Sequence, residues 1–291
     1  MNPSDLFVEN NALRFDSLKA AAKLCSKGVR WKRTTMDYLN SINRRTSNLT
    51  ERLADCSYVV SPYNHFQITE PKQRHISSST FTDRVVQRAL CKDAIYDNLT
   101  RCLIMNNAAC QTHKGTSFAV NRLQVCLRRH FMEYGTDGFV LRLDIRKFFD
   151  NISHGLLKEI VNERVPNATY KRLLFELIDS FNDPIILASF RRENAGIPLG
   201  SKMSQLFALN TLDSLDHYIV DQLHIHNYVR YMDDLVIIFL PRYFELTIIT
   251  KLIVGRIECL GFEVNHKSKI THLSDGVKFM HQKFVLTKTG K

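Results

Sequence analysis

Two adjacent carboxylates, Asp233 and Asp234, are the residues of the sequence best suited to chemistry. They stand between runs rich in β-branched and aromatic residues, 228–232 and 235–239, which predicts a hairpin with the acids at its tip. Like charges this close disfavour joint ionisation unless a cation such as a hard divalent metal neutralises them. Neighbouring strand residues point to opposite faces, so we expect Asp233 to face a site and Asp234 to point off the other face. A solvated Asp-Asp turn is the alternative for the dipeptide alone.

A third carboxylate, Asp144, ends a segment that alternates apolar residues from Phe139, which predicts a strand. If this strand is a neighbour of the hairpin in one sheet, the three acids converge. Two Mg²⁺ ions held by such a cluster would activate an attacking hydroxyl and stabilise a leaving pyrophosphate, which is two-metal phosphoryl transfer.

The charge of the chain indicates an anionic partner. The net charge is +11 over 291 residues and the pI is near 9.3, so nucleic acid is the commonest candidate, with a generically basic protein as the alternative. No apolar run approaches the ~20 residues that cross a bilayer, and no signal peptide is recognisable at the N-terminus. The seven cysteines form no C-x-x-C pair, which favours reduced thiols and a cytoplasmic location without membrane partners.

The elements before the acids are expected to be mainly helical. Residues 13–53 are helical and basic, and their charged face is either a phosphate contact or a solvated surface. Strands are predicted at 58–68 and around His75. A helix follows over 82–90, capped by Thr82 or Ser79, and another is predicted over 116–134.

Helices are then expected at 153–164, 169–181 and 244–260, with one long apolar helix over 201–223. Two short strands are expected near 270–273 and 278–286. Strands and helices alternate around an antiparallel hairpin, so the fold class is α+β and not a doubly wound sheet.

Three segments resemble, in order and spacing, the A, B and C motifs of bacterial and phage reverse transcriptases of the group II intron-like lineage. They are residues 141–152 (LRLDIRKFFDNI), 196–205 (GIPLGSKMSQ) and 231–234 (YMDD). The fingers segments of the same enzymes are similar to 71–74 and 83–87, and their motifs D and E to 261–269 and 276–279. The resemblance covers about residues 58–286.

This resemblance implies a right-hand polymerase with fingers and an antiparallel palm sheet. The implied domains are a basic helical N-terminal region at 1–57, fingers at 58–138, a palm at 139–273 with a fingers insertion at about 165–195, and a motif E-like palm/thumb junction at 274–291. A thumb is expected to be absent, truncated or replaced by an accessory protein.

The resemblance also implies roles for single residues. Asp144, Asp233 and, less directly, Asp234 would be catalytic and would ligate two Mg²⁺, for which Mn²⁺ could substitute, with the Ile145 carbonyl as a backbone ligand. Lys267 or Lys269 is a candidate general acid, with a solvated surface lysine as the alternative. The nucleotide would be held by Lys72, Arg74, Phe149 as a steric gate against the 2′-hydroxyl, Gly200 and Gln205.

The implied function is an RNA-directed DNA polymerase that makes cDNA from dNTPs on an RNA template with a DNA or RNA primer. In motif B, Leu199-Gly200 and Ser204-Gln205 depart from the usual Gln-Gly and Ser-Pro and resemble the reverse transcriptases of diversity-generating retroelements, which copy with errors at adenines. Anti-phage defence enzymes that work with a partner share much of this pattern and are an alternative. Two further alternative functions are that of a non-catalytic nucleic-acid-binding subunit and template-independent or protein-primed synthesis.

Overall fold

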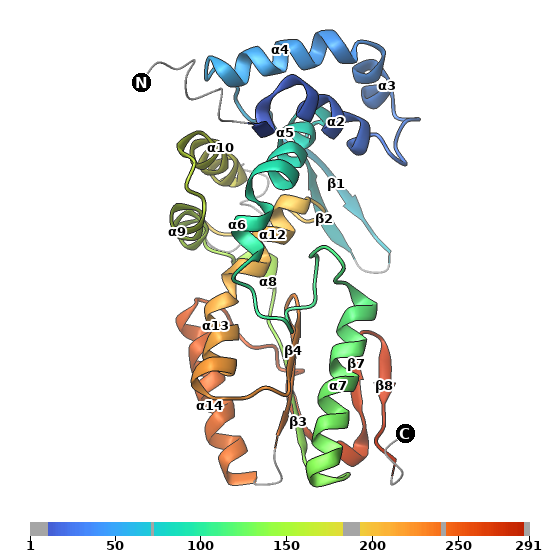
Figure 1. The fold of residues 1–291 in the computed structure, drawn as a ribbon, viewed down its shortest axis with the longest axis vertical. Coiled ribbons are helices and arrows are strands. Elements are labelled where there is room, and N and C mark those ends of the chain that lie inside the picture. Colours follow the sequence, from blue (N-terminus) through green and yellow to red (C-terminus); the bar gives the residue numbers. More distant parts are fainter. Residues whose placement is uncertain (1–10, 71–72, 183–192, 240–242, 288–291) are drawn as a thin grey trace. The chain divides into compact units, whose positions relative to one another are not determined.

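The computed structural model describes residues 11–70, 73–182, 193–239 and 243–287. The chain forms two compact units, each built from two separate stretches (Figure 1). Unit 1 comprises Met1–Cys102 and Ser153–Phe207, and unit 2 comprises Leu103–Ile152 and Ala208–Lys291. The predicted boundaries near 58, 139 and 274 stay predictions.

Unit 1 begins with helices, as the basic N-terminal region predicts. They are the 3₁₀ turn η1 (Asn11–Leu13), α2 (Phe15–Cys25), α3 (Arg33–Asn40) and α4 (Ile42–Ala54). Leu18, Ala21 and Ala22 form the buried side of α2, and Lys23 lies on its exposed side.

The strands of unit 1 form a two-stranded antiparallel sheet of β1 (Asn64–Ile68) and β2 (Arg74–Ser78). The expected strand over 58–68 is therefore too long. The residues before Asn64 do not pair in the sheet. Tyr58 instead contacts the helix that follows β2, where its hydroxyl donates to Asp83 Oδ1 at 2.7 Å.

Helix α5 (Phe81–Leu90) follows β2. The expected caps Thr82 and Ser79 are wrong: Thr80 caps the helix, because its Oγ1 accepts from the Asp83 N–H at 3.3 Å and donates to the Asp83 carboxylate at 2.6 Å. The remaining helical elements of unit 1 are the π-helical turn η2 (Cys91–Ile95), α6 (Tyr96–Thr100), α9 (His154–Arg164), α10 (Ala168–Asp179), the 3₁₀ turn η3 (Ser180–Asn182) and the first part of α12 (Lys202–Thr211).

Unit 2 is built on a four-stranded antiparallel sheet, which confirms the α+β class and the acidic hairpin. The strand order is β4-β5-β3-β6, and β7 and β8 form a separate hairpin. The strands are β3 (Phe139–Asp144), β4 (Tyr228–Tyr231), β5 (Asp234–Phe239), β6 (Lys269–His272), β7 (Val277–Phe279) and β8 (Gln282–Phe284).

Helices cover both faces of this sheet (Figure 1). On one face α7 (Thr116–Tyr134) and β7 close a core in which Leu123, Cys126 and Phe279 pack with Val140 and Val236. On the other face lie α13 (Asp213–His217) and α14 (Tyr243–Cys259). The short helix α8 (Phe148–Asn151) follows β3, and the 3₁₀ turn η5 (Leu273–Asp275) separates β6 from β7. None of the helices in the described ranges is long and apolar enough to cross a bilayer.

The single long helix expected over 201–223 is wrong. The segment divides into α12, α13 and the π-helical turn η4 (Tyr218–Gln222). The helix stops where the Thr211 hydroxyl bonds back to the Ala208 carbonyl at 2.9 Å, and a new helix begins at Asp213. This break positions Asp216 for the buried network described below.

Candidate active site

The turn between β4 and β5 consists of Met232 and Asp233, because Tyr231 and Asp234 are the last paired residues of the two strands. Met232 has a φ of 55°, the left-handed region in which a side chain is strained. Asp233 is therefore at the tip of the hairpin, as expected, on a backbone that surrounding contacts must hold in place.

Asp144 and Asp234 are directly opposite each other in the pairing of β3 with β5. Residues opposite one another in an antiparallel pair share a face of the sheet. The expectation that Asp234 points off the other face is therefore wrong. The reason is the position of the turn: only Asp233 belongs to it, and Asp234 is already the first residue of β5.

Asp234 is paired with Arg142, which precedes Asp144 by two residues and so shares its face. Arg142 Nε lies 3.2 Å from Asp234 Oδ1 and Nη2 lies 3.4 Å from Oδ2. Burial raises the pKa of Asp234 and the guanidinium of Arg142 opposes that rise. Arg142 was not predicted from the sequence, although the two-residue alternation of the strand carries the signal.

Asp144 is held by the segment before β6. Asn265 Nδ2 donates to Asp144 Oδ2 at 2.9 Å, the Asn265 N–H donates to the Asp144 carbonyl at 2.7 Å, and the Asp144 N–H donates to Ser268 Oγ at 3.0 Å. These contacts fix both the backbone and the carboxylate. Asn265 and Ser268 lie in the motif D-like segment but were not singled out from the sequence.

Asp233 has the most perturbed carboxyl of the site. Burial, together with the nearby charges of Asp144 and Asp234, raises its pKa to about 6. Its backbone carbonyl accepts from the Ile145 N–H at 3.3 Å, which ties the turn to the residue after β3. Three acids are thus gathered at one edge of the sheet, where ionisation of all three is unfavourable without a cation.

A buried ion pair contacts the turn between β4 and β5. Arg230 and Asp216 are both fully buried, and Arg230 Nε and Nη2 donate to the two carboxylate oxygens of Asp216 at 2.7 and 2.6 Å. Tyr228 also donates to Asp216, at 2.6 Å. Arg230 Nη1 donates to the Met232 carbonyl at 3.0 Å. This network was not predicted from the sequence, because it depends on the tertiary structure.

The carboxylates are suited to a hard divalent cation that substrate helps to hold. Within the described ranges, no three His, Cys, Asp or Glu side chains form a complete metal cage. Mg²⁺ in phosphoryl-transfer sites takes one or two carboxylates, and water and substrate phosphates complete its shell. Asp144 and Asp233 match this requirement, because the charge crowding at Asp233 is what a cation relieves, whereas Asp234 is engaged with Arg142.

A cavity of about 380 Å³ in unit 2 is lined by one of the three acids, Asp234. Asp234 and Arg142 form one side, and the β7–β8 hairpin forms the other with Lys278, His281 and Lys283. A carboxylate therefore faces a recess that is otherwise basic, an arrangement that suits a phosphate-bearing strand.

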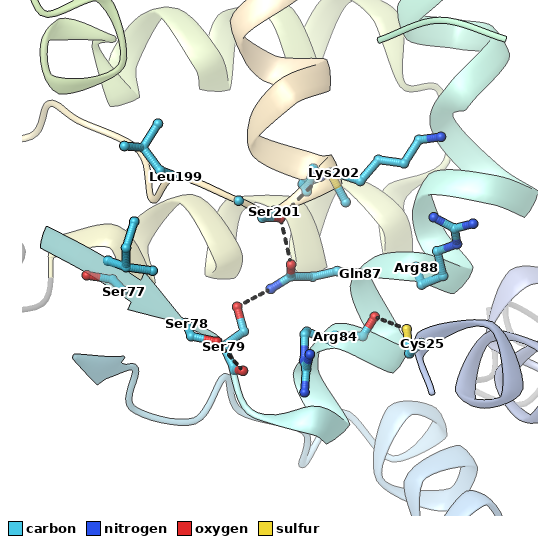
Figure 2. A pocket seen from close by; sticks show the side chains of 13 residues that line it. Cys25, Ser77, Ser78, Ser79, Arg84, Gln87, Arg88, Leu199, Ser201 and Lys202 are labelled. Carbon is cyan, nitrogen blue, oxygen red and sulfur yellow. Dashed lines mark hydrogen bonds between the residues drawn. The ribbon is translucent and has the colours of Figure 1, made fainter. Parts of the chain in front are cut away.

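Unit 1 contains a second cavity of about 380 Å³, around the motif B-like loop (Figure 2). Gln87 of α5 lies at its centre. Its Nε2 donates to Ser79 Oγ at 3.2 Å, and its Oε1 accepts from Ser201 Oγ at 3.0 Å. This amide joins Ser79, the residue after β2, to the loop that precedes α12.

The lining of this cavity is basic and contains no acidic residue: Arg84, Arg88 and Lys202 supply the charge. Arg84 Nε and Arg88 Nε are buried and have no hydrogen-bond partner among the described residues. Gly200 has a φ of 95° and a Cβ there would meet no atom within 4 Å. A glycine is therefore required at position 200 by the backbone conformation and not by crowding.

The other predicted residues fall in both units. Phe149 in α8 is half-buried, with its ring centre 5.7 Å from that of the buried Phe148. Lys267 and Lys269 are exposed, and Lys269 is opposite Arg142 in the sheet. Gly200 lines the unit 1 cavity, Gln205 is half-buried in α12, Arg74 is the first residue of β2, and Lys72 lies outside the described residues.

Comparison with known families agrees with these observations. Residues 68–284 match the family model described as reverse transcriptase (RNA-dependent DNA polymerase). Protein YkfC of Escherichia coli K12 is 23% identical over 249 residues, covering 74% of this chain and 64% of YkfC. A COX1/OXI3 intron 1 protein of Saccharomyces cerevisiae is 22% identical over 203 residues, covering 67% of this chain and 22% of that protein. The chain thus spans less than two thirds of either relative.

Among solved structures, the telomerase from Candida albicans in complex with a TWJ fragment of telomeric RNA superposes with a TM-score of 0.53. The match is 13% identical and covers 77% of this chain and 44% of that chain. This similarity confirms the expected fingers–palm polymerase fold with its antiparallel sheet.

Proposed function

Because the chain belongs to the reverse transcriptase (RNA-dependent DNA polymerase) family, we propose that it extends a primer with dNTPs on an RNA template by nucleotidyl transfer. The observation that carries the proposal is the meeting of Asp144, Asp233 and Asp234 at one edge of the unit 2 sheet. Burial and the charges of Asp144 and Asp234 together raise the pKa of Asp233 to about 6, and a bound cation would relieve both effects.

Each acid has its own role in this proposal. Asp144 and Asp233 would hold divalent cations, which supply charge neutralisation for the attacking hydroxyl and the leaving pyrophosphate when bound. Asn265 keeps the Asp144 carboxylate oriented at 2.9 Å. Asp234 keeps Arg142 at the site, beside the basic recess of the β7–β8 hairpin, which would receive the primer phosphates.

The unit 1 cavity is proposed to contact the nucleotide or the template. Arg84, Arg88 and Lys202 line this cavity, and their positive charge suits a phosphate group. Gly200 and Leu199 line the same cavity, in agreement with the nucleotide-binding role expected for the motif B-like loop. Arg74 and Lys72 remain proposed triphosphate ligands.

Primer extension tests the proposal. Purified protein with an RNA template, an annealed DNA primer, dNTPs and Mg²⁺ is expected to elongate the primer. Asp233→Asn and Asp144→Asn are expected to abolish elongation, because each removes an anionic ligand. The matched control Asp275→Asn changes an exposed acid of unit 2 and is expected to keep full activity.

Retained synthesis by Asp233→Asn would refute the metal role of the hairpin. An inactive wild-type protein that still binds RNA but shows no Mg²⁺-dependent dNTP binding would support a non-catalytic binding subunit instead. Elongation without template or primer would point to template-independent or protein-primed synthesis.

We further propose that copying is error-prone, as in a diversity-generating retroelement. Leu199, where the usual motif has an amide, lines the unit 1 cavity beside Ser201 and Gln87, so an aliphatic group replaces a polar constraint there. Sequencing of cDNA is expected to show misincorporation concentrated opposite template adenines, and Leu199→Gln is expected to reduce it. Uniformly low error would favour the anti-phage defence alternative.

A further inference from the structure

Trp31, the single tryptophan of the chain, is on the surface of unit 1. It is 75% exposed in the turn between α2 and α3. Its indole Nε1 donates to the Gly28 carbonyl at 3.2 Å, and Lys32 Nζ lies 5.5 Å from its ring centre. The polar atom of the ring is thus satisfied inside the turn, while the apolar faces remain largely open to solvent. The exposed ring offers a flat apolar face on which another planar group can stack.

The turn that carries Trp31 is ordered by its own backbone. The N–H groups of Lys27, Val29 and Lys32 donate to carbonyls three residues earlier at 3.1–3.3 Å. Gly28 has a φ of 76°, which a glycine adopts without strain. The ring is therefore held on a fixed support, so a ligand that binds it immobilises little protein.

The segment that carries Trp31 is basic. Between Asp16 and Asp37 there is no acidic residue. Lys19 and Lys23 are four residues apart in α2 and therefore lie on one side of the helix, and Lys27 follows in the turn. The cations of this segment are Lys19, Lys23, Lys27, Arg30, Lys32 and Arg33. Such a stripe complements a polyanion.

We infer that residues 19–33 bind an unpaired RNA strand, with one base stacked on Trp31 and its flanking phosphates on the basic stripe. Aromatic stacking requires an open base face, and in a duplex both faces of an internal base are covered by its neighbours. An exposed ring among cations is the arrangement that binds single strands. The choice of RNA over DNA rests on the proposed function, whereas the stacking does not.

The single tryptophan makes the test direct, because all indole emission comes from Trp31. Titration of the full chain with a short oligouridylate, without Mg²⁺ or dNTPs, is expected to quench this emission. A blunt RNA duplex of matched length is expected to quench little, since it offers no free base face along its length. Equal quenching by the duplex, or quenching by anionic phosphatidylserine vesicles and not by oligouridylate, would overturn the inference.

Variants provide a second readout, the affinity for labelled oligouridylate by anisotropy. Trp31→Ala is expected to bind roughly 5- to 100-fold more weakly and Trp31→Phe to recover most of the loss. Lys32→Gln is expected to lower the slope of log affinity against log salt by roughly 0.7, whereas Trp31→Ala leaves that slope unchanged. The control Met132→Ala removes an 86% exposed apolar side chain of unit 2 and is expected to bind like wild type.

Unchanged affinity in Trp31→Ala would refute the stacking contact, and a circular dichroism melt checks that the variant is folded. Asp233→Asn separates this inference from the proposed function. In that variant quenching by oligouridylate is expected to persist while primer extension is lost. Loss of quenching in wild type alongside normal primer extension would overturn the inference alone.

Discussion

Arg230 and Asp216 form a bidentate ion pair in which neither side chain is accessible to solvent, and the same guanidinium donates to the carbonyl of Met232. One arginine thereby neutralises a buried acid and holds the strained residue beside Asp233. The two consequences can be separated by mutation.

Arg230→Met is expected to lower the free energy of unfolding by about 3–5 kcal/mol, because it leaves the Asp216 carboxylate buried without its cation. Adding Asp216→Leu is expected to restore much of this loss in urea unfolding, since neither charge is then buried. Primer extension is expected to stay low in the double variant, because the Met232 carbonyl has lost its donor. Full activity in the double variant would show that the contact with Met232 is dispensable. Arg146→Met, which breaks the exposed pair with Glu263, is the control and is expected to cost at most about 1 kcal/mol.

Asp233 is expected to make the stability of the protein pH-dependent. Its pKa in the folded protein is about 6, against an ordinary value of 3.8, so the fold favours the protonated acid and loses stability as pH rises through about 6. With a chelator present to remove divalent metal, the free energy of unfolding of Asp233→Asn at pH 8 is expected to exceed that of wild type by up to about 3 kcal/mol. Below pH ~4 the two proteins are expected to be nearly equally stable. Urea unfolding measures both.

Glu258→Gln, at an exposed position of α14, is the control and is expected to follow the wild-type pH profile. Mg²⁺ is expected to reduce the difference in stability between Asp233→Asn and wild type at pH 8, since a bound cation relieves the repulsion between the carboxylates. A constant difference between Asp233→Asn and wild type from pH 4 to pH 8 would contradict the burial and charge crowding at Asp233.

Asn265 is expected to govern cation affinity without governing the fold. Asn265→Ala removes the donor that orients the Asp144 carboxylate and is expected to raise the Mg²⁺ concentration for half-maximal activity roughly 10- to 100-fold, as is common for groups behind metal ligands. Asn48→Ala, exposed in α4, is the control. An unchanged Mg²⁺ dependence in a folded Asn265→Ala protein would rule out this orienting role.

Phe149 is expected to set the choice between deoxyribonucleotides and ribonucleotides. Phe149→Ala removes a half-buried ring and leaves space in its place. The variant is expected to increase incorporation of rNTPs relative to dNTPs in primer extension. Phe148 is its matched control, because it is buried between Phe149 and Phe262. Phe148→Leu is expected to cost stability and to leave the sugar preference unchanged; the reverse pattern would assign the gate to Phe148.

The parts of the fold that depend on local patterns could be predicted from the sequence. Apolar alternation identified β3 with both ends correct, and the bounds predicted for α7 were also correct. The acidic hairpin also followed from its flanking strands. These signals arise from residues close in sequence, so no knowledge of the tertiary structure is needed to interpret them.

The register and the partners of the acids could not be predicted in the same way. Arg142 and Asp234 are 92 residues apart, and Asn265 follows Asp144 by 121. Whether such residues meet depends on which strands pair and where the turn begins, and a shift of one residue moves a side chain to the other face. The break of the helix expected over 201–223 could not be predicted for the same reason. It positions Asp216 to contact Arg230, a residue of a different element.

The central place of β3 has a consequence for how the protein is made. Both strands that pair with it, β5 and β6, come later in the chain. During synthesis at roughly 5–20 residues per second, β3 therefore leaves the ribosome several seconds before it has a neighbour, with Val140, Leu141 and Leu143 exposed. Contacts so distant in sequence also form slowly. During that interval β3 is open to chaperones and to aggregation, and the three acids come together only after it has passed.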